Sequence, residues 1–268
     1  MLRSGGKAAL INIVRRNGRS THRLRSSVFS IDSALLHSMK RLLVIFSLAV
    51  AVAAQARGAS GEYILLVGGP SLHQWEQYKA YPHDHWWANF LHAARLRTEQ
   101  VRAQLGPDAM ITMLVYKQGY LDRAKQEHQD LIGYINSVGE KFHLNLIYFQ
   151  NGSEVINYLN NGQNRERLKI TGFEYFGHSN RACFMFDYSN NIDSACKSWL
   201  HDSELTKISR GIFARRAYIK SWGCHTGEEM SKKWYSATGT HMIGAVGKTQ
   251  YMMEELPILV SQSDKWVN

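Results

Sequence analysis

The chain has 268 residues and a formal net charge of +10, with 32 Lys and Arg against 22 Asp and Glu. The excess lies in the N-terminal part, since residues 1–57 contain ten Lys and Arg and a single acidic residue, Asp32. Residues 58–268 carry 22 basic and 21 acidic residues, so we expect no nucleic-acid partner for this part of the chain.

A targeting signal is the first element predicted along the chain. The positively charged Met39-Lys40-Arg41 precedes an apolar run over residues 42–54, and Ala54-Gln55-Ala56 provides a small-residue cleavage pattern. This order is typical of a secretory signal peptide, although an apolar element of the folded domain is the alternative. The run is too short to span a bilayer, which takes about 20 residues. We therefore expect residues 39–56 to be a signal peptide, the protein to be secreted or periplasmic, and the mature chain to lack a membrane span.

Residues 1–38 precede this signal and are rich in Arg and Ser. Two interpretations are open. Either Met39 is the true start of translation and the preceding residues are an annotation artefact, or residues 1–38 form a basic leader of the transit-peptide type. We favour the first interpretation because signal peptides stand at the beginning of a chain.

Residues 60–268 are predicted to form one α/β domain. The predicted strands are short, nearly continuous apolar runs, which is typical of parallel strands buried on both faces. Six strands are expected, at 63–67, 110–115, 144–149, 170–176, 217–221 and 242–246, with a small extra strand at 183–187. Helices are expected at 86–105, 131–142, 153–159, 200–213 and 227–235. This alternation predicts a three-layer sandwich, with a mostly parallel six-stranded sheet and helices on both faces.

Two chemically capable side chains directly follow predicted strands. His178 comes after the strand at 170–176, and Cys224 comes 46 positions later, after the strand at 217–221. Functional groups of such sheets gather at the carboxyl ends of the strands, and consecutive strands are commonly neighbours. A Cys and a His held side by side are the minimum machinery of a thiol nucleophile. Packing residues at two strand ends are the simpler interpretation of either residue alone.

The motifs Gly177-His178-Ser179 and Trp222-Gly223-Cys224-His225-Thr226-Gly227 resemble those of caspase-like cysteine peptidases. That group includes caspases, metacaspases, legumains and gingipains. The resemblance implies a caspase-like fold and a cysteine endopeptidase without a cofactor, acting on peptides or proteins. It implies that Cys224 is the nucleophile, that His178 gives a proton to the leaving amine, and that the backbone N–H groups of Ser179 and Cys224 bind the oxyanion.

Two positions depart from the motifs of that group. Ser179 stands where the second glycine of Gly-His-Gly is found, and Trp222 stands where metacaspases have an acid that binds a basic substrate residue. Trp222 is therefore predicted to be an aromatic wall of the substrate site. His83 and Asp84, in the loop after the first strand, are also predicted to contact substrate. A zinc site in this histidine-rich loop and a plain solvated loop are the alternatives, and no metal is expected.

Three cysteines are present, an odd number for an exported protein. Cys183 and Cys196 bracket a polar stretch and are predicted either to form a disulfide or to remain free, and a disulfide would leave Cys224 as the lone thiol. Besides an endopeptidase, two further functions fit the pattern. One is a caspase-like binding module without activity, and the other is a thiol-dependent amidase or acyltransferase acting on small molecules.

Overall fold

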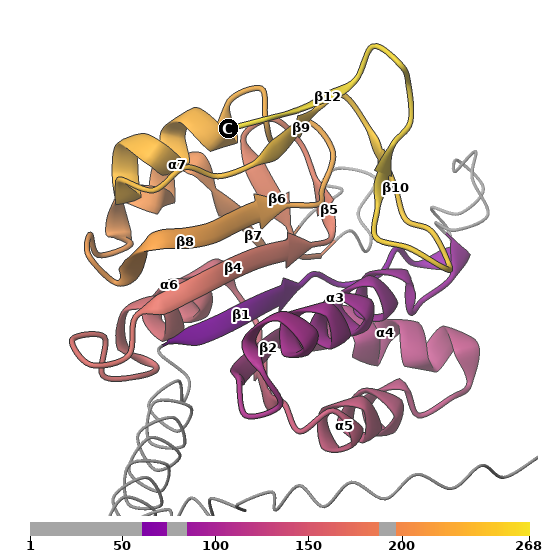
Figure 1. Ribbon diagram of the computed structural model, residues 1–268. Helices are drawn as coiled ribbons and strands as arrows, with labels where there is room; N and C mark the ends of the chain where they lie inside the picture. The colour runs from indigo at the N-terminus through magenta and orange to yellow at the C-terminus, as the bar shows by residue number, and fades with distance from the viewer. Residues whose placement is uncertain (1–60, 74–84, 188–196) are drawn as a thin grey trace, which may run out of the picture. The chain divides into compact units, whose positions relative to one another are not determined.

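Five parallel strands form the central sheet in the computed structural model of the chain (Figure 1). The structure describes residues 61–73, 85–187 and 197–268. The predicted leader, the signal peptide, His83, Asp84 and Cys196 lie outside these residues. The strands follow the order β3-β2-β1-β4-β8 across the sheet. Their bounds are β1 Glu62–Val67, β2 Met110–Tyr116, β3 Asn145–Phe149, β4 Ile170–Phe176 and β8 Phe213–Ser221.

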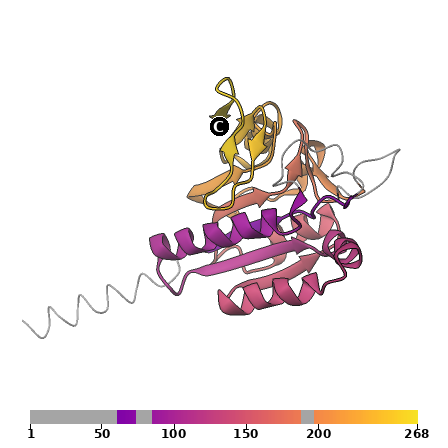
Figure 2. The same cartoon turned by 90° about the vertical axis from the view of Figure 1, so that its right-hand side faces the viewer.

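Helices cover both faces of this sheet, as the continuous apolar strands predict. Alternate residues of β1 enter different cores, since Ile64 and Leu66 belong to one cluster and Leu65 and Val67 to the other. One face packs against α3 (Asn89–Leu105), α4 (Lys117–Glu127) and α5 (Leu131–Lys141). The other packs against α6 (Gly152–Asn161) and α7 (Met230–Thr238). Figure 2 shows α3 lying along the strands. The α/β class with a parallel sheet between helices is therefore confirmed.

The prediction that residues 242–246 form a sixth strand of the central sheet is wrong. Residues 244–246 form β9 (Gly244–Val246), which pairs antiparallel with β12 (Lys265–Val267) in a separate two-stranded sheet. A single parallel bridge from Ile243 to Lys220 links this segment to β8. The segment is too short to continue the ladder, because after Ile243 its backbone turns to pair with the end of the chain.

Two helix predictions also need correction. Instead of a helix over 200–213, the chain forms β7 (Trp199–His201), a short 3-10 helix η2 (Asp202–Lys207) and the start of β8. Leu205 and Ile208 are buried at a helix-like spacing, but Ile208 already has an extended backbone. Helix α7 begins at Met230 rather than at 227, because a turn occupies the residues after Cys224. Helix α4 was not predicted.

Two small antiparallel sheets complete the described part of the chain. One contains β5 (His178–Ser179), β6 (Cys183–Met185) and β7, and it extends the chain beyond the end of β4. The other pairs β10 (Thr249–Gln250) with β11 (Ile258–Leu259). The first follows β4 directly, and the segment of β10 contacts the turns after β4 and β8 through Tyr251 and Thr249, so both add backbone around that edge of the sheet.

A buried carboxylate, Glu174 on β4, ties together three elements on the α3 face of the sheet. The Arg97 Nε on α3 donates a hydrogen bond to it at 2.5 Å, and the indole N–H of Trp222 donates at 2.6 Å. The hydroxyl of Tyr63 on β1 is the third donor. A buried ion needs several such partners to offset its loss of hydration, and Glu174 has them.

Replacing Glu174 by Gln is expected to cost about 3 kcal/mol in the free energy of unfolding, because it leaves the Arg97 cation buried without its counter-charge. Equilibrium urea unfolding measures this loss. Glu99→Gln is the matched control, since Glu99 lies on the same helix as Arg97 and forms an exposed ion pair with Arg95 at 3.0 Å. Its loss should stay below about 0.5 kcal/mol. Equal losses in the two variants would contradict the assignment.

Lys220 on β8 lies opposite Glu174 in the sheet register and is also buried. Its ammonium group lies 3.5 Å from the ring centre of Trp222 and 3.9 Å from that of Trp266. Burial lowers the pKa of Lys220 to about 8, Arg97 adds to the lowering, and the Glu174 charge opposes it. The unfolded chain therefore binds this proton more tightly than the folded protein, so folding becomes more favourable as the pH rises above 8.

We expect Lys220→Met to raise the free energy of unfolding at pH 7 by about 1–2 kcal/mol, since the rings of Trp222 and Trp266 offset part of the desolvation cost. This advantage over the wild type should shrink between pH 8 and pH 10, where the wild-type lysine loses its proton. Urea unfolding of both proteins across this range tests the prediction. Lys125→Met, at an exposed position, provides the control. An advantage that stays constant with pH would refute the assignment.

Candidate active site

The strand pairing brings His178 and Cys224 to the same edge of the sheet. Strands β4 and β8 are parallel neighbours, and Tyr175 pairs with Ser221. His178 and Cys224 each follow the paired residue by three positions. The two strands are therefore in register where they end, and the turns that carry the imidazole and the thiol leave the sheet side by side.

A direct hydrogen bond joins the two turns. The Ser179 hydroxyl donates to the backbone carbonyl of Cys224 at 2.7 Å. Gly223 passes so close to Ser179 that a Cβ atom at position 223 would collide with this hydroxyl. The serine that departs from the expected second glycine therefore contacts the turn that carries Cys224, and this close approach requires a glycine at position 223.

His178 is held from the loop after β1. The Ser71 hydroxyl lies 2.8 Å from the His178 Nε2, and the imidazole packs edge-on against the Phe90 ring at 4.8 Å. Ser71 is itself fixed, because its carbonyl accepts a hydrogen bond from the buried guanidinium of Arg123 at 2.8 Å. Ser71 was not singled out from the sequence. Its place directly after Gly68-Gly69-Pro70, at the end of the first predicted strand, is the signal that could have identified it.

The Cys224 sulfur contacts Thr249 on β10 and forms no hydrogen bond with His178. The Thr249 N–H donates to Sγ at 3.3 Å, and the Thr249 hydroxyl lies 3.5 Å from it. Two residues further on, the Tyr251 hydroxyl accepts a hydrogen bond from Gly177 N–H at 2.9 Å. The segment that carries β10 therefore contacts both turns of the candidate site.

The backbone N–H groups of Ser179 and Cys224, which are predicted to bind an oxyanion, lie on the two turns after β4 and β8. Asn180 N–H donates to the carbonyl of Cys183, so the N–H of the preceding Ser179 points away from β6 in this antiparallel pair. In the part of the chain that the structure describes, Cys224 N–H donates no hydrogen bond. Their role in binding an oxyanion stays a prediction.

Trp222 lies in the interior rather than on a wall of the site. It is 6% exposed, its indole N–H is taken up by Glu174, and its ring stacks on Phe176. Its predicted contact with substrate finds no support in this position. The sequence position before a nucleophile does not reveal on which side of the backbone a large ring packs.

Neither Cys183 nor Cys224 forms a disulfide with another described residue. Cys183 is buried, with its sulfur 3.4 Å from the Asn180 side-chain oxygen, and burial raises the pKa of its thiol. Because Cys196 lies outside the described residues, the Cys183–Cys196 disulfide stays a prediction, as do the substrate contacts of His83 and Asp84.

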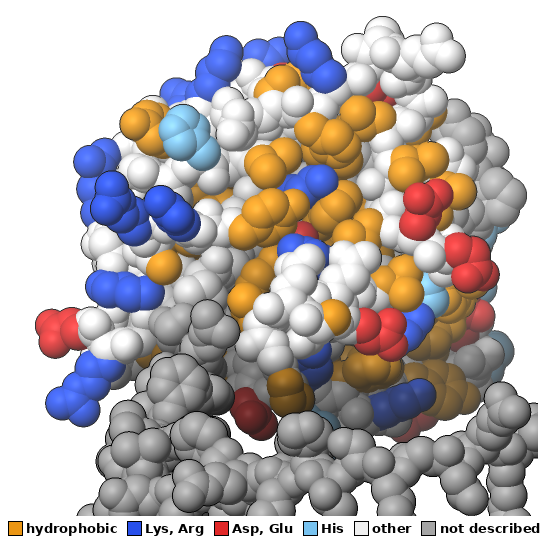
Figure 3. All heavy atoms as spheres, viewed as in Figure 1, with side chains coloured by type: hydrophobic (Ala, Val, Ile, Leu, Met, Phe, Trp, Pro, Cys, Tyr) orange, Lys and Arg blue, Asp and Glu red, His pale blue; other side chains and the backbone are white. Residues whose placement is uncertain are grey.

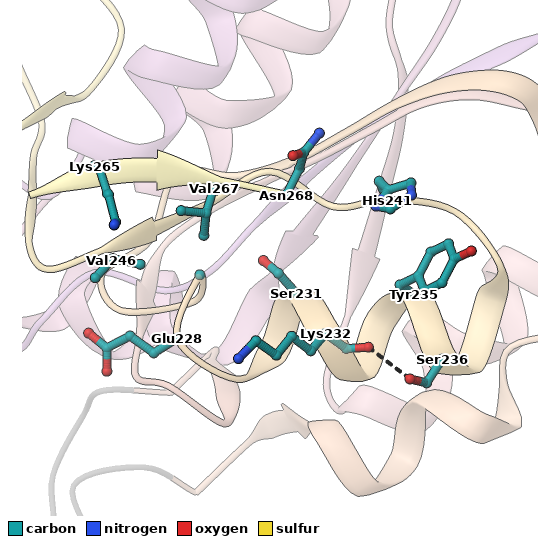
Figure 4. A pocket seen from close by; sticks show the side chains of 11 residues that line it. Glu228, Ser231, Lys232, Tyr235, Ser236, His241, Val246, Lys265, Val267 and Asn268 are labelled. Carbon is teal, nitrogen blue, oxygen red and sulfur yellow. Dashed lines mark hydrogen bonds between the residues drawn. The ribbon is translucent and has the colours of Figure 1, made fainter.

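A pocket of about 670 Å³ lies beside the site, between α7, β9 and β12 (Figure 4). Its lining includes Lys232, Tyr235, His241 and Lys265, but neither His178 nor Cys224. Within residues 61–73, 85–187 and 197–268, no three His, Cys, Asp or Glu side chains form a group that could hold a metal ion. No helix in the same ranges is long and apolar enough to cross a membrane.

Comparison with known proteins adds no relative. No protein-family model matches the chain, and neither a curated protein nor a solved structure shows significant similarity to it.

Ser71→Ala should change the NMR signal of the His178 Nε2 nitrogen, because that atom loses its hydroxyl partner. The accompanying loss in the free energy of unfolding should be about 1 kcal/mol, the usual net contribution of one hydrogen bond. Ser137→Ala removes an exposed hydroxyl on α5 and should leave the His178 signal unchanged. An unchanged signal in Ser71→Ala would mean that Ser71 does not contact the ring in solution.

Proposed function

We propose that this chain is an exported cysteine endopeptidase of caspase-like architecture. The observation that carries the proposal is the in-register end of β4 and β8, which places an imidazole and a thiol on adjacent turns. The N–H groups of Ser179 and Cys224 add a place for a developing negative charge. Export is inferred from the signal-peptide pattern of residues 39–56.

In this mechanism the Cys224 sulfur attacks the carbonyl carbon of the scissile peptide bond, and His178 takes up the thiol proton. The carbonyl oxygen becomes an oxyanion between the N–H groups of Ser179 and Cys224. Each such donor typically contributes about 3 kcal/mol to transition-state stabilisation. His178 then gives its proton to the leaving amine as the C–N bond breaks and a thioester remains. Water attacks the thioester, restores the thiol and releases the acid.

The contacts of His178 support a role in proton transfer. Ser71 holds one ring nitrogen and Phe90 one edge of the ring, so the imidazole has a defined orientation. The sulfur does not form a hydrogen bond with the ring. This arrangement suits a histidine that acts on the leaving group once substrate lies between the two side chains.

The second candidate is a caspase-like binding module without catalysis. The observation that favours it is the position of the Cys224 sulfur, which accepts a hydrogen bond from Thr249 and forms none with His178. A thiol-dependent amidase or acyltransferase for small molecules would use the same dyad on another substrate class. These candidates differ in thiol reactivity and in the size of the substrate.

A covalent thiol probe distinguishes the active from the inactive candidate. We expect the probe to label the folded wild type at Cys224, to give no such label in Cys224→Ala, and to react about 100-fold more slowly in His178→Ala. Cys183→Ala is the matched control and should retain the label, because Cys183 is buried. A folded wild type that is not labelled would favour the binding module.

A peptide-library digestion then tests the substrate class. Cleavage products within peptides, lost in Cys224→Ala, are expected for an endopeptidase. Labelling by the probe without any internal cleavage of peptides would favour the small-molecule amidase or acyltransferase.

A further inference from the structure

The Cys224 sulfur has three contacts with one residue, Thr249. The Thr249 N–H donates to Sγ at 3.3 Å, the hydroxyl oxygen lies at 3.5 Å, and the backbone carbonyl lies at 3.8 Å. These separations fall within hydrogen-bonding range for sulfur, and Thr249 is buried. None of the motifs around His178 or Cys224 includes this residue, which lies 25 positions after the thiol.

Thr249 is itself held in place. Its hydroxyl donates to the Trp222 carbonyl at 2.8 Å, and its strand pairs with β11 opposite Leu259. Trp222 lies two residues before the nucleophile and is anchored by Glu174. Strand β10 is therefore fixed from both sides, and the sulfur lies against a preorganised surface rather than against a mobile side chain.

Thr249 can form hydrogen bonds with both protonation states of the sulfur. While Cys224 carries its proton, the S–H can donate to the Thr249 oxygen atoms. After the proton leaves, the sulfur is an acceptor only, and the hydroxyl can rotate from the Trp222 carbonyl toward it. The thiolate then faces two donors, the N–H and the O–H of Thr249. Hydrogen bonds to the charged form of a group favour that form.

We propose that Thr249 is a positioning residue that holds the Cys224 sulfur and stabilises its thiolate. The proposal rests on the proposed function of Cys224 as a nucleophile. It requires no further reactant, because the thiol proton passes to His178 or to solvent and no other bond forms or breaks.

Ionisable groups on the neighbouring segments could also affect the thiol, and the test must distinguish their effect from that of Thr249. On the segments next to Cys224 and Thr249 these groups are His178 on β5, His225 and Glu228 in the turn of Cys224, and Lys248, which precedes Thr249. His225 and Glu228 are paired with each other at 2.6 Å. Substitutions at position 249 leave all four in place, so a change in thiol reactivity in these variants reports on Thr249.

The test is the rate of alkylation of Cys224 by iodoacetamide between pH 5 and pH 10, followed at that residue by peptide mass spectrometry. Thr249→Val keeps the shape and removes the hydroxyl. We expect it to slow the reaction at pH 7 about threefold to tenfold and to move the midpoint of the pH profile upward, because one donor to the thiolate is lost. Thr249→Ser retains the hydroxyl and should stay within about twofold of the wild type.

Wild-type or faster alkylation in a folded Thr249→Val protein would overturn the proposal, and so would a Thr249→Ser protein as slow as the valine variant. Near-ultraviolet circular dichroism establishes folding. If the Thr249→Val protein does not fold, Thr249→Ala provides the same comparison, because it also lacks the hydroxyl and has a smaller side chain. Alkylation does not depend on peptide cleavage. Suppose that the wild type cleaves no peptide and that alkylation of Cys224 is slower in Thr249→Val. This result would support the role of Thr249 and reject the endopeptidase function.

Discussion

The parallel pairing of β4 with β8 is the constraint on which the candidate site depends. Parallel strands deliver their carboxyl ends to one edge of a sheet, and the register between Tyr175 and Ser221 sets how far each chain continues before it turns. A shift of one residue in this register would move Cys224 relative to His178 and turn alternate side chains of β8 to the other face. The relative position of His178 and Cys224 is therefore set by the backbone hydrogen bonds between the two strands.

The interior next to the site is charged, and this has a structural purpose. Glu174, Arg97 and Lys220 occupy the α3 face of the sheet close to the ends of β4 and β8, with Trp222 bonded to the carboxylate. On the surface, basic and acidic side chains gather on different sides of the molecule. Figure 3 shows Lys and Arg side chains gathered where the strands of Figure 1 begin, and Asp and Glu toward the side where they end. The buried network holds the residues that precede the thiol, so packing and site geometry share the same contacts.

The strands and the edge that bears His178 and Cys224 could be predicted because their signals are local. Buried parallel strands are continuous apolar runs, and a strand end is marked by a change to Gly and polar residues. The partners of the two side chains could not be predicted in this way. Ser71 meets His178 across 107 positions and Thr249 meets Cys224 across 25, and no short motif records such contacts. The missing sixth strand has the same cause, because pairing with β12 depends on where the chain returns.

Ser179 has a mechanical consequence. Its hydroxyl donates a hydrogen bond to the carbonyl of Cys224, so the turn that carries His178 and the turn that carries Cys224 are joined at one point. Through this hydrogen bond, a displacement of either turn also displaces the other. The spacing between the His178 ring and the Cys224 sulfur is thus a property of the whole sheet edge, and it resists changes that reach only one of the two strands.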